Sequence, residues 1–198
     1  EKIEKEPNYS YAAARLLLNC LYKEVFKEGV DSEAFECQYR KSFIQNIKKL
    51  VKQEMLDERL LGFDFVKLSE ALKIDRDKKF KYLGIQILFD RYFIRSEKKI
   101  METPQAFWMR VAMGLSINEE DKNEKAIEFY NLFSQFLYTA STPTLFNSGT
   151  THSQLSSCYL NTFDDSIDGI FDGAWQEARK SKFAGGLGFD VTPFRPSG

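Results

Sequence analysis

The clearest indication of the fold lies in residues 158–194, which read CYLNTFDDSIDGIFDGAWQEARKSKFAGGLGFDVTPF. Residues 158–163 have the composition of a short strand, and residues 189–194 predict a second one. Between them, the acidic and hydroxyl residues at 164–166 can cap a helix over about 167–183, with carboxylates at its positive end. Strand, helix and strand in this order are typical of a parallel sheet or barrel. Because two parallel strands cannot bury both faces of a sheet, we expect a domain that is only begun here.

The residues before position 137 predict a series of helices without repeats or flexible linkers. In residues 10–26, apolar side chains recur at helical spacing and predict one buried face. That face is expected to comprise Ala12, Ala13, Leu16, Leu17, Cys20, Leu21, Val25 and Phe26. Further helices are expected over residues 33–55, 65–72, 104–117 and 122–138. Residues 81–93, KYLGIQILFDRYF, suit either a buried helix or a strand, and periodicity does not decide between the two.

Thr103 and Pro104 form a helix-start signal, in which an N-cap residue precedes proline at the first helical position. The helix that they begin is apolar on most faces, so we expect it to be buried. Further along, residues 141–157, STPTLFNSGTTHSQLSS, are rich in turn-forming residues and predict a stiff loop. We therefore divide the chain into a helical domain, residues 1–136, and the start of a second domain, residues 137–198.

The composition argues against several classes of function. The formal net charge is -1, so the chain shows no footprint of nucleic-acid binding. Cys20, Cys37 and Cys158 form neither a disulfide framework nor a zinc-binding pair, and the single His152 excludes a histidine-rich metal site. No apolar run reaches the roughly 18–20 residues of a membrane span, and the N-terminus lacks a signal-peptide core. We therefore expect a cytoplasmic protein with no metal site, no nucleic-acid partner and no membrane association.

Cys158 is the strongest single candidate for chemistry. A free cysteine in a strand is more often a small buried apolar residue, but Ser156 and Ser157 precede this one and polar, turn-rich segments flank it. Cys20 and Cys37 are expected to be structural.

The glycine-rich segment AGGLG, residues 184–188, invites comparison with a dinucleotide-binding loop. Such a loop follows a strand and opens a helix, whereas this segment follows a predicted helix and opens a predicted strand. Its glycines are better suited to a close approach of the backbone to a ligand or another chain. The hydroxyls and N–H groups of residues 142–147 would suit a phosphate, although surface loops of this composition are common.

Taken together, STPTLFNSGT, QLSSCYL, DDSIDGIFD and SKFAGGLGFDVTPFRPSG resemble the large-subunit family of ribonucleotide reductases over residues 141–198. The preceding helices, including TPQAFWMRVAMGL, are similar to the family's N-terminal helical domain. The resemblance implies a mainly α N-terminal domain that leads into the first βαβ unit of a ten-stranded α/β barrel. It also implies the N-terminal part of the alpha subunit of a class I enzyme, which reduces ribonucleoside diphosphates to deoxyribonucleotides for DNA synthesis.

The resemblance assigns roles to four residues around the substrate. Cys158 matches the first-strand cysteine beside the ribose, one of a redox pair that becomes a disulfide as the 2′-hydroxyl leaves as water. Thr142 and Ser157 match positions that hydrogen-bond the substrate, with Thr142 on the phosphate side. Gly186 matches the glycine whose backbone packs against the nucleotide.

A second group of residues matches the family's allosteric site. Asp165, Ser166 and Ile167 match the segment that binds a deoxynucleoside triphosphate effector, and Arg195 matches the arginine that holds the effector phosphates. The family also uses ATP as an effector and forms a homodimer through the helix after Ser166. The implied partners are a metal-containing small subunit that supplies the radical, and thioredoxin or glutaredoxin as reductant. No cofactor is expected to bind this segment itself.

Several functional residues of the family pattern are not found in this sequence. The radical-bearing cysteine, the redox partner of Cys158, the neighbouring glutamate and the C-terminal cysteine pair lie on later segments, and the family's ATP cone is not found ahead of Glu1. We therefore expect the 198-residue chain alone to reduce no ribonucleotide. Two alternatives stay open: an adenosylcobalamin-dependent reductase of class II, and a non-catalytic helical module that keeps a nucleotide site.

Overall fold

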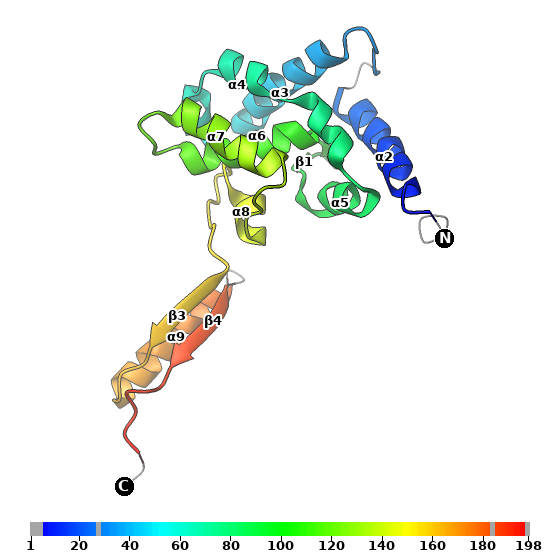
Figure 1. The fold of residues 1–198 in the computed structure, drawn as a ribbon. Helices are drawn as coiled ribbons and strands as arrows, with labels where there is room; N and C mark the ends of the chain where they lie inside the picture. Colours follow the sequence, from blue (N-terminus) through cyan, green and yellow to red (C-terminus); the bar gives the residue numbers. More distant parts are fainter. Residues whose placement is uncertain (1–5, 27–28, 183–184, 197–198) are drawn as a thin grey trace.

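The computed structural model describes residues 6–26, 29–182 and 185–196 as a helical body from which a strand–helix–strand unit projects (Figure 1). The helical body contains α2 (Tyr9–Phe26), α3 (Phe35–Lys52), η1 (Glu58–Gly62), α4 (Phe65–Ala71), η2 (Ile74–Lys79), α5 (Tyr82–Ile87), η3 (Leu88–Tyr92), the hairpin β1 (Arg95–Ser96) and β2 (Lys99–Ile100), α6 (Pro104–Ser116), α7 (Lys122–Ser134) and α8 (Thr142–Asn147). The projecting unit contains β3 (Cys158–Thr162), α9 (Ile167–Lys182) and β4 (Gly186–Asp190).

The helix α6 forms the centre of the body, as its apolar sequence predicts. Every residue from Pro104 to Met113 is buried, and α6 packs mainly against α7. Thr103 does occupy the N-cap position, but its hydroxyl makes no capping hydrogen bond. The helix start therefore rests on the fixed φ of Pro104 rather than on a side-chain cap.

The predicted buried face of α2 is partly wrong. The buried residues are Ala14, Leu18, Leu21, Tyr22, Val25 and Phe26, whereas Leu16 is 69% exposed and Cys20 is exposed. A segment this rich in alanine and leucine offers two apolar faces, and periodicity alone does not choose between them. The choice is made by packing against α3 and α5.

The structure decides one segment that the sequence left open and corrects another. Residues 81–93, for which helix and strand were both open, form α5 followed by the π-helical turn η3. The predicted loop at 141–147 is wrong, because α8 is a short helix there. Ser141 is extended at the N-cap and Pro143 lies in the first turn, so the Thr-Pro pair acts as a helix start rather than as a loop signal.

The projecting unit is a parallel βαβ unit, as predicted. β3 pairs with β4 in register from Cys158↔Gly186 to Thr162↔Asp190, and α9 packs against both strands. The second strand begins earlier than predicted, at Gly186, and residues 191–194 form a turn closed by Phe194 N–H donating to the Val191 carbonyl. Gly188 suits the strand interior because an added Cβ would lie 2.9 Å from the Leu160 side chain. Residues 183 and 184, the end of the predicted helix and the start of the predicted glycine-rich break, lie outside the described residues.

The fold class expected from the sequence is confirmed in the described residues: a mainly helical region leads into a parallel βαβ unit. The described sheet has two strands and is not closed. Its face away from α9 is uncovered, with Leu160 87% exposed. The domain boundary between residues 136 and 137 stays a prediction.

Candidate functional site

Three of the four predicted substrate residues meet where β3 and β4 begin. Cys158 is the first residue of β3 and stands opposite Gly186, the first residue of β4. The Gly186 N–H donates to the Ser157 carbonyl at 2.7 Å, and the Ser157 hydroxyl lies 3.7 Å from the Cys158 Sγ. A Cβ added to Gly186 would lie 3.2 Å from that same carbonyl, so the glycine permits the close approach of the strands. Cys158 is exposed, as are Cys20 and Cys37.

Thr142, the fourth predicted substrate residue, lies on a separate element. It opens α8, and its hydroxyl shares a 3.1 Å hydrogen bond with the Tyr92 hydroxyl. The same helix is tied to the segment that leads into β3, because the Thr144 hydroxyl donates to the Leu155 carbonyl at 3.0 Å. The structure therefore connects Thr142 to Cys158 through α8 and residues 155–157 rather than by direct contact of the two side chains.

The residues of the predicted effector site gather at the other end of the same unit. Ser166 caps α9, since its hydroxyl accepts from the Gly169 N–H at 3.0 Å. Asp165 is not a cap: its carboxylate forms an ion pair with the Arg195 guanidinium and accepts from the Arg195 N–H at 3.2 Å. Ile167 is 76% exposed. The sequence places Asp165 and Arg195 thirty positions apart, and the parallel strand pairing brings them together.

This end of the unit remains accessible to a ligand. The Arg195 side chain is 82% exposed, so its ion pair with Asp165 is weak and easily exchanged for another anion. Nearby, Asp190 ends β4 and accepts from the hydroxyl and N–H of Thr192, which lower the pKa of its carboxyl. The strands run from Cys158 away from the helical body towards this end, which lies near the C-terminus (Figure 1). β3 alone spans roughly 13 Å between its first and last residues.

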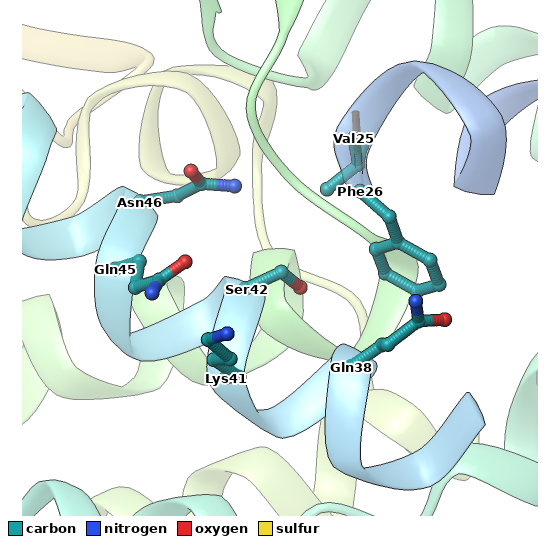
Figure 2. A pocket seen from close by; sticks show the side chains of 7 residues that line it. All are labelled: Val25, Phe26, Gln38, Lys41, Ser42, Gln45 and Asn46. Carbon is teal, nitrogen blue, oxygen red and sulfur yellow. The ribbon is translucent and has the colours of Figure 1, made fainter. Parts of the chain in front are cut away.

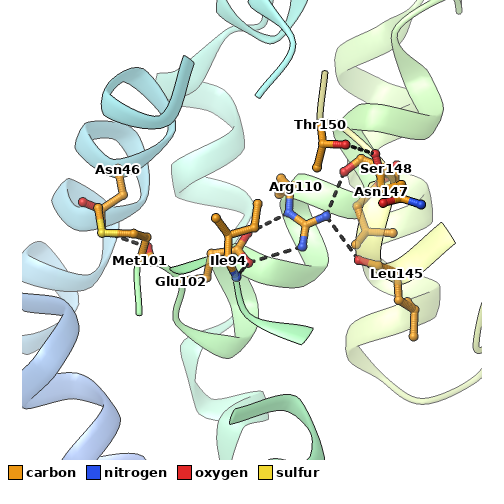
Figure 3. A network of polar contacts seen from close by, with 10 residues as sticks. Asn46, Ile94, Met101, Glu102, Arg110, Leu145, Asn147, Ser148 and Thr150 are labelled. Carbon is orange, nitrogen blue, oxygen red and sulfur yellow. Dashed lines mark hydrogen bonds and ion pairs between the residues drawn. The ribbon is translucent and has the colours of Figure 1, made fainter. Parts of the chain in front are cut away.

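One buried polar network, which contacts α8, is not predicted by the sequence analysis (Figure 3). Arg110 on α6 is fully buried and pairs with Glu102, with its Nε 2.7 Å from Oε1. Its Nη1 donates to the main-chain carbonyls of Leu145 and Ser148. The sequence signal was available, because an arginine in a helix that is apolar on most faces must find a buried partner.

A second buried network joins the helices of the body. Asp77 accepts hydrogen bonds from the hydroxyls of Tyr22 and Tyr39 at 2.7 and 2.8 Å, and from the Gln105 amide at 2.7 Å. Burial raises the pKa of Asp77 to about 6, although these hydrogen bonds act in the opposite direction. Burial also raises the pKa of Tyr39 well above its usual value. The network links α2, α3, η2 and α6, so its role is structural.

Cavities in the body do not coincide with the predicted site residues. The pocket in Figure 2, of about 110 Å³, lies between α2 and α3. Two of its polar side chains donate to main-chain carbonyls, Ser42 to that of Tyr39 and Asn46 to that of Met101. A larger cavity of about 300 Å³ adjoins Asp77. Neither has a lining residue in β3, α9 or β4.

The described residues contain neither a metal-binding cluster nor a membrane-spanning helix. Within residues 6–26, 29–182 and 185–196, no group of three or more histidine, cysteine or acidic side chains is arranged to hold a metal ion. Across the same part of the chain, no helix has the length and apolar character needed to cross a bilayer.

Comparison with known proteins places the chain in a family. Residues 78–153 match the family model described as "Ribonucleotide reductase, all-alpha domain", and residues 156–198 match "Ribonucleotide reductase, barrel domain". Together these matches cover more than half of the chain. Their junction lies in the segment that connects α8 to β3.

Named relatives agree with these matches. The chain is 48% identical over 196 residues to the ribonucleoside-diphosphate reductase subunit alpha of Chlamydia trachomatis, covering 99% of this chain and 19% of that protein. It is 38% identical over 193 residues to the subunit alpha of Helicobacter pylori, and 40% identical over 197 residues to the large subunit of Danio rerio, covering 97% and 98% of this chain and 24% of each relative. The chain thus spans 19–24% of the length of these curated relatives. It belongs to the ribonucleotide reductase large-subunit family.

Proposed function

We propose that the chain is part of the catalytic subunit of a class I ribonucleoside-diphosphate reductase, an oxidoreductase that makes deoxyribonucleotides for DNA synthesis. The names of the relatives support this proposal. The observation that carries it is the register of β3 and β4, which sets an exposed Cys158 opposite Gly186 and joins Gly186 to Ser157.

The proposed role of Cys158 is that of a reducing thiol. Replacing the 2′-hydroxyl of a ribonucleotide by hydrogen, with loss of water, consumes two electrons and two protons. Two thiols supply both as they form a disulfide, which an external dithiol such as thioredoxin or glutaredoxin can reduce again by exchange. Cys158 is one of these thiols, and the second belongs to a part of the subunit beyond these residues. Ser157 and Thr142 hydrogen-bond the nucleoside diphosphate, and the Gly186 backbone packs against it.

The far end of the βαβ unit is proposed as the site for a deoxynucleoside triphosphate or ATP effector. Its residues are Asp165, Ser166, Ile167 and Arg195, of which Arg195 offers an exposed guanidinium fork suited to phosphates. Since β3 and β4 connect this end directly to Cys158 and Gly186, occupation of one site can bias the other through the strands.

The proposed partners follow from the same assignment. The outward side chains of α9 include Phe171 and Trp175, 71% and 57% exposed, and suit a homodimer formed through this helix. A small subunit that contains a metal would supply the radical. The proposed location is the cytoplasm, and the proposed division of the chain is a helical domain to residue 136 and the beginning of the catalytic barrel from residue 137.

The experiment that tests this function uses the complete subunit that contains this chain, assayed for diphosphate reduction with its small subunit. Cys158→Ser should reduce turnover to background, because serine can form no disulfide. Cys37→Ser is the matched control, since Cys37 is also an exposed free thiol but lies on α3, and it should keep full activity. Full activity of Cys158→Ser would refute the redox role.

Other outcomes separate the alternatives. A wild-type enzyme that needs adenosylcobalamin instead of a small subunit belongs to class II. A complete protein that binds the effector nucleotide but neither binds nor reduces a ribonucleoside diphosphate is a non-catalytic module.

A further inference from the structure

Arg110 uses its whole guanidinium group to join three parts of the chain (Figure 3). Its Nε and one terminal nitrogen donate to the two carboxylate oxygens of Glu102, at 2.7 and 3.3 Å. The other terminal nitrogen donates to the carbonyls of Leu145 and Ser148, at 3.2 and 2.8 Å. Glu102 in turn accepts from the Ile94 N–H at 2.9 Å. Arg110 therefore fixes the C-terminal half of α8 against α6 and the hairpin.

The end of α8 is held at this position by further contacts. The Ser148 hydroxyl donates to the Val111 carbonyl at 2.7 Å. Gly149 has a φ of +77°, and a Cβ there would lie 3.2 Å from the Arg110 carbonyl. The loop thus lies directly on the backbone of α6, with little room for movement.

From α8, hydrogen bonds lead on towards β3. The Asn147 amide donates to the Gln154 carbonyl at 2.7 Å, and the Thr144 hydroxyl donates to the Leu155 carbonyl at 3.0 Å. The Gln154 amide then donates to the Ser156 carbonyl at 2.6 Å. Two residues later the chain reaches Cys158.

We infer that Arg110 is a positioning residue for the substrate site, acting through α8, which carries Thr142 and orients the segment that leads to Ser157 and Cys158. The inference rests on the proposed function. A buried ion pair is not in itself an efficient stabiliser, because apolar residues of similar volume often serve as well. What an apolar side chain cannot do is bind two carbonyls of another helix at a fixed distance. The geometry of α8, rather than the stability of α6, is what this arginine specifies.

The test compares variants of the complete reductase, assayed with its small subunit, for kcat, for KM towards a ribonucleoside diphosphate and for the Kd of the effector nucleotide. Arg110→Lys should raise KM about tenfold, since a lysine ammonium cannot pair with Glu102 and also bind both carbonyls. Asn147→Ala should lower kcat/KM about fivefold, because it removes one link between α8 and the segment before β3. The effector Kd should stay unchanged in both variants.

Ser116→Ala is the matched control, because its buried hydroxyl bonds only within α6, to the Ala112 carbonyl, and its KM should equal that of the wild type. A purely structural role for Arg110 would lower the melting temperature and leave KM per active enzyme unchanged, which would overturn the inference. Should Arg110→Lys fail to bind effector because it does not fold, Asn147→Ala decides, and an unchanged kcat/KM would overturn it. An inactive wild-type enzyme would instead refute the proposed function.

Discussion

At the scale of single residues, Asp77 gives the folded protein a definite pH dependence. Burial raises its pKa from 3.8 to about 6, so the folded state prefers the protonated form. The stability that this preference contributes is present below pH 4 and is lost as the pH rises through about 6, at a cost of roughly 3 kcal/mol. Asp77→Asn should remove this decline, as measured by urea unfolding between pH 4 and 7. An identical decline in both proteins would contradict the assignment.

Individual residues also show what the sequence could and could not predict about the site. Cys158, Ser157 and Gly186 were assigned through a family resemblance, and the strand register does bring them together. No sequence pattern predicts that Asp165 pairs with Arg195, because the pairing depends on where the two strands end in space. Although each residue was assigned to the effector site, their mutual contact was not predicted.

At the scale of elements, the contact between α6 and the end of α8 depends on Gly114. A Cβ at this position would overlap the main chain of Ser148 and Gly149, lying 2.6 Å from the Ser148 carbonyl carbon. Gly114→Ala should therefore destabilise the protein by about 3 kcal/mol in urea unfolding. Gly84→Ala is the matched control in α5, where a Cβ would meet Phe80 at an ordinary 3.5 Å, and it should stabilise by roughly 0.5–1 kcal/mol. Equal effects of the two substitutions would contradict the proposed close approach.

Elements differ in how far the sequence predicted them, for physical reasons. Long periodic segments such as α3 and α7 were predicted within a few residues, because their burial pattern repeats over several turns. The short helix α8 was missed, since six residues give too little periodicity to outweigh turn-forming composition. The sequence predicts the start of β4 too late, because glycines usually mark breaks. Here Gly185 lies against the Tyr159 side chain and Gly188 against that of Leu160.

At the scale of the whole molecule, the placement of the cysteines predicts that the 198-residue chain alone is inactive. Cys20 and Cys37 lie on α2 and α3 in the helical body, while Cys158 opens the projecting unit, so no second thiol is positioned beside it. Incubation with a ribonucleoside diphosphate, a dithiol and the small subunit should give no deoxynucleotide by chromatography. Any product formed by the purified chain would contradict this arrangement.

The most direct test of the redox role of Cys158 is a single turnover of the complete subunit, with its small subunit and substrate but without external reductant. Peptide mass spectrometry after the reaction should find Cys158 in a disulfide with a cysteine from outside these residues, in proportion to the deoxynucleotide formed. Deoxynucleotide formation with Cys158 still a free thiol would contradict the account.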